Sequence, residues 1–200
     1  IQGGTLEIIG FTAAIFQIVK SSFQIPIAKY LDKNHGEKDD YYSLVIGSFI
    51  IALVPFLYIF ASKPVHLFLI NGFYGLGAAF AIPPWNAIFT RHIDKMHEST
   101  DWAVESVSIG IGAAAAAALG GILADKFGFD FVFAVAGVVA IAGAVVLTKI
   151  YSNLMEKVGT GQILHSSLED AVGADGLPRI LAAVLAGLGV LLILRSLLTS

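Results

Sequence analysis

Three polar residues inside the first long apolar segment are the strongest candidates for chemistry. Gln17, Lys20 and Gln24 follow i, i+3, i+7 spacing, which places them on one helix face together with Ala13. A cation at the centre of a bilayer costs at least about 2.5–3.5 kcal/mol on insertion scales, so its presence needs a reason. One reading is a substrate pathway in which Lys20 contacts a solute or an ion. The alternative is a lysine that packs inward against backbone carbonyls or snorkels to the interface.

Two further polar residues lie in or near apolar segments. Asn71 can hydrogen-bond across helices, either in the pathway or as part of helix packing. Glu105 is a possible coupling residue, but it lies only ~5 Å into its helix, whereas Lys20 lies ~16 Å from the corresponding end. We therefore do not expect a direct pair. The alternative for Glu105 is an acid in the first turns of a helix, where it complements the helix dipole.

Catalytic, metal and nucleotide sites are not expected. The chain has no cysteine, and its histidines are scattered over loops and helix ends. Neither the GxGxxG nor the GxxxxGK[ST] pattern occurs, and no nucleophile–base arrangement is visible. Asp39 and Asp40 are interpreted as part of a solvated charged loop. We expect no enzyme activity, no metal and no cofactor.

The composition is that of a membrane protein. Of 200 residues, 56% are hydrophobic and 14% are charged, against about 25% charged in soluble domains. A net charge of −3 gives no reason to expect a nucleic-acid partner. We expect an all-α, polytopic membrane helix bundle that contacts the lipid bilayer.

A spanning helix needs about 20 mainly apolar residues, and six segments qualify. The first five would form a bundle over 1–151, followed by a polar cytoplasmic linker at 152–177. The last segment would be an additional transmembrane helix within 178–200. The six expected helices are 5–31, 41–61, 65–90, 102–124, 129–151 and 178–198.

Small residues and prolines predict how these helices pack and bend. Small residues four apart let helix backbones approach closely in lipid, and proline inside a helix favours a kink. The residues assigned to packing and bending are Gly75, Gly77, Pro83, Pro84, Gly112 and Gly120.

Loop charges predict the orientation. The connections 29–40, 91–101 and 149–157 carry seven lysines and arginines, whereas 62–64 and 125–130 carry two. The positive-inside rule places the first set in the cytoplasm, so the first helix would enter from outside.

Three motifs resemble the major facilitator superfamily of transporters. Its fourth-helix motif is similar to LINGFYGLGAA at 69–79, with Asn71 at the motif's arginine position. The end of its loop between helices two and three resembles AKYLDK at 28–33, and its glycine-rich fifth helix resembles GIGAAAAAALGGILADKFG at 110–128. The match corresponds to helices two to six of one six-helix half. The family's first helix has no counterpart, as though the beginning of a longer polypeptide were absent.

The resemblance implies secondary active transport of a small solute by alternating access, in a multi-pass protein of the plasma membrane. It also implies a cytoplasmic gate formed by Asp32, Lys33 and Arg91, in which Asp32 pairs with a cation or a helix N-terminus when the bundle is closed. Because Asn71 carries no charge, a proton-coupling arginine role does not transfer. Two alternatives remain: a non-transporting subunit that acts only with a partner half-bundle or as a homodimer, and an inert piece of a larger transporter.

Overall fold

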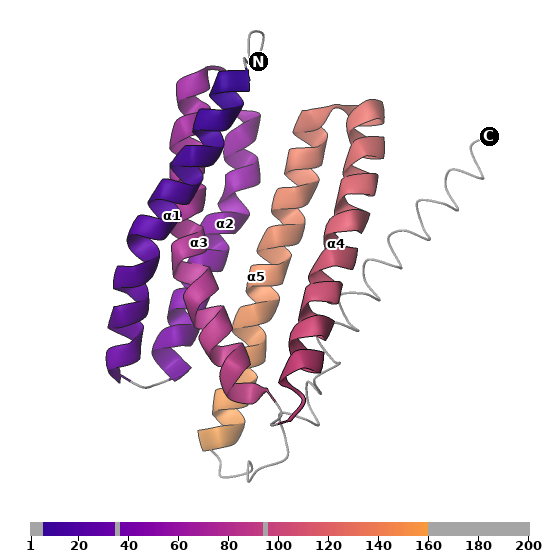
Figure 1. Cartoon of the computed structure of the whole chain (residues 1–200). Helices are drawn as coiled ribbons and strands as arrows, with labels where there is room; N and C mark the ends of the chain where they lie inside the picture. The colour runs from indigo at the N-terminus through magenta and orange to yellow at the C-terminus, as the bar shows by residue number, and fades with distance from the viewer. Residues whose placement is uncertain (1–5, 35–36, 94–95, 160–200) are drawn as a thin grey trace, which may run out of the picture. The chain divides into compact units, whose positions relative to one another are not determined.

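Five long helices make up the part of the chain that the structure describes. The computed structural model describes residues 6–34, 37–93 and 96–159, and no strand occurs among them (Figure 1). All five helices contain a stretch that is long and apolar enough to cross a membrane, which confirms the all-α membrane fold. The helices are α1 (Leu6–Asn34), α2 (Glu37–Ile59), α3 (Pro64–His92), α4 (Glu98–Phe127) and α5 (Phe129–Gly159).

The helix ends follow local sequence rules. Three acids, Glu37, Asp39 and Asp40, lie in the first turn of α2, where they complement the positive end of the helix dipole. Pro64 opens α3, a position at which its missing N–H costs nothing. Gly128 alone separates α4 from α5, and its φ of +83° is one that glycine adopts without strain.

Three predicted boundaries differ from the structure by four residues or more. Helix α2 begins at Glu37 rather than 41, because the acids that were interpreted as loop form its first turn. Helix α4 begins at Glu98 rather than 102. Helix α5 continues to Gly159, past residue 151 where the linker was expected. The remainder of that linker and the helix expected at 178–198 lie outside the described residues.

The described helices fall into two units. The first holds α1, α2, α3 and α5 as far as residue 154, and the second holds α4 up to Lys126. In the first unit α1 and α2 each pack along α3 and scarcely touch each other, so α3 is the central helix of the three (Figure 1). Helix α5 contacts α2, where the rings of Tyr58 and Phe133 stack with centroids 5.3 Å apart.

The most buried segment is the middle of α3. Ala78 and Ala79 are 3% and 0% exposed, and the side chain of Pro84 is also fully buried. Pro83 and Pro84 lie inside a continuous helix, and α3 changes direction in its C-terminal half (Figure 1). Small side chains here let two neighbouring helices reach the backbone of α3 from different sides.

Candidate functional site

The contact between α2 and α3, the α2–α3 seam, has almost no space between the two backbones. A Cβ built on Gly47 would lie 2.6 Å from both the backbone nitrogen of Ala81 and the carbonyl oxygen of Gly77. A Cβ on Gly77 would lie 2.6 Å from Cγ2 of Ile50. The Ser43 hydroxyl also donates to the carbonyl of Phe80 at 2.8 Å. This seam is therefore closed by backbone approach and by a polar contact.

The contact between α1 and α3, the α1–α3 seam, has one close crossing. A Cβ on Gly75 would lie 2.6 Å from the carbonyl oxygen of Phe16 and 3.2 Å from the backbone nitrogen of Lys20. One turn earlier, a Cβ on Gly72 would meet only side chains, at 3.8 Å or more. The crossing therefore places the backbone of the predicted pathway residue Lys20 directly against α3.

Among the described residues, Lys20 has an aromatic neighbour and no acidic partner. Its Nζ lies 5.6 Å from the ring centroid of Phe16, within the range of a cation–π interaction. The Phe16 ring in turn packs on Tyr74 of α3, with centroids 4.7 Å apart. Among the described residues no carboxylate pairs with Lys20. Lys20 is half-buried as a residue, and its ammonium lies over the Phe16 ring beside the α1–α3 seam.

The two glutamines of the predicted stripe flank this lysine. Gln17 is exposed and Gln24 is half-buried. Neither amide makes a hydrogen bond to another described side chain. The stripe therefore keeps its hydrogen-bonding capacity over about two turns of α1.

Asn71 is placed elsewhere. Its side chain is 8% exposed, and its amide nitrogen donates to the Tyr58 hydroxyl at 2.7 Å and to the carbonyl of Leu67 at 3.0 Å. The bond to Tyr58 ties α3 to α2, the bond to Leu67 stays within α3, and neither reaches α1. The structure therefore does not bring Asn71 together with the stripe of Gln17, Lys20 and Gln24.

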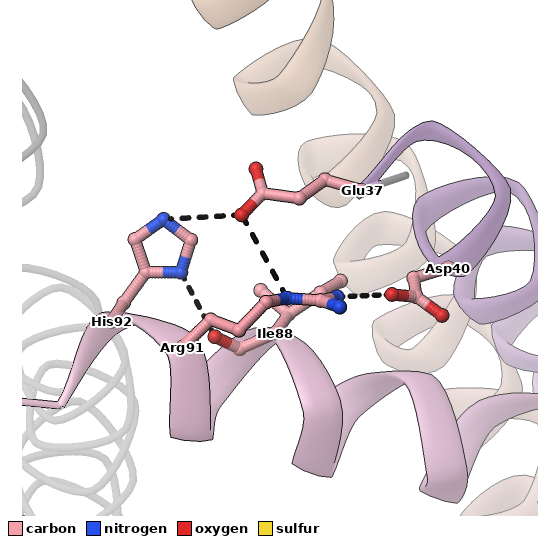
Figure 2. A network of polar contacts seen from close by, with 5 residues as sticks. All are labelled: Glu37, Asp40, Ile88, Arg91 and His92. Atoms are coloured by element: carbon pink, nitrogen blue, oxygen red, sulfur yellow. Dashed lines mark hydrogen bonds and ion pairs between the residues drawn. The ribbon is translucent and has the colours of Figure 1, made fainter. Parts of the chain in front are cut away.

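A charged cluster closes the end of the α2–α3 seam (Figure 2), and we call Glu37, Asp40, Arg91 and His92 the α2–α3 clasp. The Arg91 guanidinium pairs with the Asp40 carboxylate, and its Nε lies 3.9 Å from Oε1 of Glu37. Nε2 of His92 lies 3.6 Å from the same Glu37 oxygen, and Nδ1 of His92 lies 2.9 Å from the carbonyl of Ile88. The clasp therefore joins the first turn of α2 to the last turn of α3.

The interpretation of Asp40 as a solvated loop residue was wrong. Asp40 is 4% exposed and belongs to a helix. Its cation, Arg91, stands 51 residues later in the sequence, so the residues around Asp40 do not predict the pair. The charges at the helix ends could have predicted it. Acids begin α2, an arginine and a histidine end α3, and these ends meet when the two helices are antiparallel neighbours.

The other predicted gate and coupling residues are not gathered at the clasp. Asp32 and Lys33 are exposed at the end of α1, and the described acids that contact Arg91 both belong to α2. Glu105 lies near the start of α4, in the second unit. In α4, Gly112 and Gly120 are half-buried, and no described residue of this helix is fully buried.

An open groove of about 410 Å³ lies between α1 and α2 on the same side of the first unit as the loop that joins them. Its walls include Ile27 and Tyr30 of α1 and Tyr42 and Ile46 of α2, and Phe80 of α3 also lines it. Lys20 does not line this groove, so it is distinct from the predicted pathway. Within the described ranges, no group of three histidines or acids is arranged to hold a metal.

Comparison with known proteins shows one distant relative and one family. The chain is 25% identical over 144 residues to an uncharacterized MFS-type transporter of Methanocaldococcus jannaschii. That alignment covers 72% of this chain and 36% of the relative, so the chain matches about a third of a longer protein. No solved structure matches the chain. The sequence pattern of the Major Facilitator Superfamily matches residues 2–199, and the chain therefore belongs to that family of multi-pass membrane proteins.

Proposed function

We propose that the complete protein carries out secondary active transport of a small solute across the plasma membrane by alternating access. The observation that carries the proposal is Lys20, a charged residue in the middle of a membrane helix with no acidic partner among the described residues. Charged groups inside the membrane face a bundle interior or a water-filled cavity, and they mark substrate or ion pathways. The stripe of Gln17, Lys20 and Gln24 would line that pathway.

In the proposed transport cycle, α2 and α3 would move as one body and α1 would move relative to them. The α2–α3 seam is held by its clasp as well as by close backbone approach, whereas α1 packs along α3 with one close glycine crossing and no ion pair to α3 among the described residues. We assign the gate at the predicted cytoplasmic end to Asp32 and Lys33. Because Arg91 is already held by Asp40 and Glu37, the partner of Asp32 in the closed state would come from another part of the complete protein.

Uptake by the complete protein tests the proposal. Cells that express it are compared with empty-vector cells for accumulation of a panel of labelled organic acids, amines, sugars and nucleosides. The Lys20→Ala variant is expected to lose solute uptake, and the Asp32→Asn variant is expected to take up solute more slowly. The exposed Lys63→Ala, at the opposite end of the spans, serves as the control that keeps wild-type uptake.

If both Lys20→Ala and Asp32→Asn transported at the wild-type rate with equal amounts of protein in the membrane, the proposed pathway and gate would be wrong. A complete protein that transports nothing alone, but regains uptake when a partner half-bundle is co-expressed, would favour the non-transporting subunit.

A further inference from the structure

Lys20 differs from every other charged residue in the described spans by its depth. It lies 14 residues after Leu6 and 13 residues before Lys33, the ends of its span. Charged residues of the other spans lie closer to an end: the acids of α2 in its first turn, Arg91 in the last turn of α3, Asp130 in the first turn of α5, and Glu105 of α4 seven residues after Glu98. In the described spans, the centre of the membrane therefore contains one charge, and it is positive.

The contacts of Lys20 do not neutralise that charge. The Phe16 ring offers a cation–π attraction of about 0.5–2 kcal/mol. This attraction is smaller than the cost of placing a lysine at the bilayer centre, which is at least about 2.5–3.5 kcal/mol on insertion scales. The ring itself is fixed by Tyr74 of α3, so it holds the ammonium in place without cancelling its charge. The site is left with a net positive charge and up to three N–H donors.

The neighbours of Lys20 favour the same kind of ligand. Gln17 and Gln24 lie on its helix face and each offers two further N–H donors. No carboxylate of the first unit is paired with any of the three. Rings or clusters of lysine select anions in membrane pathways for this reason: an anion gains the attraction that a cation would lose.

We propose that the transported solute is an organic anion, such as a carboxylate, sulfonate or phosphonate, whose charged group docks against the Lys20 ammonium. This inference rests on the proposed function, since it names the substrate class of the same pathway. A cationic solute would meet repulsion at the centre of the membrane. A neutral solute would leave the lysine charge uncompensated by any described residue.

The absence of cysteine from residues 1–200 allows a direct test of the field around Lys20. In the complete protein, with any cysteines elsewhere replaced, a Gln24→Cys variant is treated with two methanethiosulfonate reagents of similar size. One reagent carries a sulfonate and the other a trimethylammonium group. Residues four apart on a helix lie about 6 Å from each other, so the thiol would sample the field of Lys20. The ratio of the two labelling rates, corrected for their rates with free thiol, is the measurement.

We expect the sulfonate reagent to react faster at Gln24→Cys. Adding Lys20→Gln should lower the sulfonate-to-trimethylammonium ratio on the order of tenfold, because a unit charge is removed close to both probes. Lys20→Arg keeps the charge and should keep the ratio. Ser62→Cys, in the exposed turn between α2 and α3, is the control that both water-soluble reagents should label at a ratio independent of Lys20.

The outcomes separate this inference from the proposed function. If neither reagent labels Gln24→Cys while both label Ser62→Cys, the stripe does not face a water-filled pathway, and the proposed function loses its site. If Gln24→Cys is labelled but the trimethylammonium reagent is favoured, or the ratio is unchanged by Lys20→Gln, the pathway stands and the anionic substrate class is wrong.

Discussion

Both seams along α3 are closed by glycines, but the helices that meet there are held in different ways. On the α2 side, Gly47 and Gly77 bring backbones together, and the clasp then joins the helix ends. On the α1 side, Gly75 makes one crossing, and α1 keeps a single fully buried residue, Leu31, among those described. Both seams hold a cation, but Arg91 has two acids whereas Lys20 has a ring.

The comparison distinguishes a cation that is paired with acids inside the fold from a cation that can still bind a ligand. Arg91 compensates a buried carboxylate, so its attraction is already used in holding α2 to α3. Lys20 is held in position without a counter-ion among the described residues, so its attraction remains for a ligand. The free energy of unfolding of the purified complete protein, measured by titration with SDS, compares the contributions of the two seams and of the two cations.

The largest effect is expected at the α2–α3 seam. In Gly47→Ala the new methyl group would lie 2.6 Å from two backbone atoms of α3, and neither can move without shifting the helix. We expect a loss of about 3 kcal/mol, at the upper end of ordinary overpacking. Gly10→Ala is the control, because a Cβ there meets nothing within 4 Å. Equal free energies for the two variants would show that the seam is not closed in membranes.

The clasp should give the next effect. Arg91→Gln leaves the buried Asp40 carboxylate without its cation, and we expect a loss of about 2 kcal/mol. This is less than for a fully buried pair, because the Arg91 side chain is 40% exposed. Adding Asp40→Asn to Arg91→Gln should restore most of the loss.

Glu37→Gln is the matched control for the clasp. Its side chain is 52% exposed and its contact with Arg91 is 3.9 Å long, so we expect a change below about 0.5 kcal/mol. If Glu37→Gln cost as much as Arg91→Gln, the exposed contacts and not the buried Asp40 would carry the clasp.

A smaller effect is expected at the α1 crossing. Gly75→Ala places a methyl group 2.6 Å from the Phe16 carbonyl oxygen, but α1 keeps only Leu31 fully buried among its described residues, so it can shift more easily than α2. We expect a loss of about 1 kcal/mol. Gly72→Ala, whose Cβ would have ordinary contacts at 3.8 Å, should be neutral. A cost at Gly75 equal to that at Gly47 would mean that α1 is held as firmly as α2.

The smallest effect on stability is expected at Lys20. Lys20→Met removes a charge that no described carboxylate compensates, so the free energy of unfolding should stay within about 0.5 kcal/mol or rise. Uptake, in contrast, should be lost. Lys29→Met, near the end of α1, should change neither quantity. A marked loss of stability in Lys20→Met would instead support the packing alternative for this lysine.

The positions of the helices could be predicted from the sequence, because length and hydropathy determine which segments can span a bilayer. All five spans within the described residues were predicted with boundaries a few residues away. The charged end of α2 was misread, since Asp39 and Asp40 look like loop residues until the first turn of a helix is considered.

The clasp could not be predicted in the same way. The burial of Asp40 depends on a cation 51 residues later, and one sequence contains no record of which helix ends meet. Asn71 shows the same limit, because its hydrogen bond to Tyr58 depends on how α2 and α3 are packed. Lys20 was the opposite case, since its depth in an apolar segment is a property of the sequence alone.

The α2–α3 clasp also has a consequence for how the chain is made. The connection between α2 and α3 is a four-residue turn, so the hairpin can form soon after both helices leave the ribosome. Arg91 and Asp40 meet only when both helices cross the bilayer fully and in opposite directions, because each residue stands at the end remote from that turn. A hairpin in which only one of the two helices crossed the bilayer would leave the carboxylate and the guanidinium on different sides of the membrane. The ion pair therefore stabilises only the fully inserted hairpin.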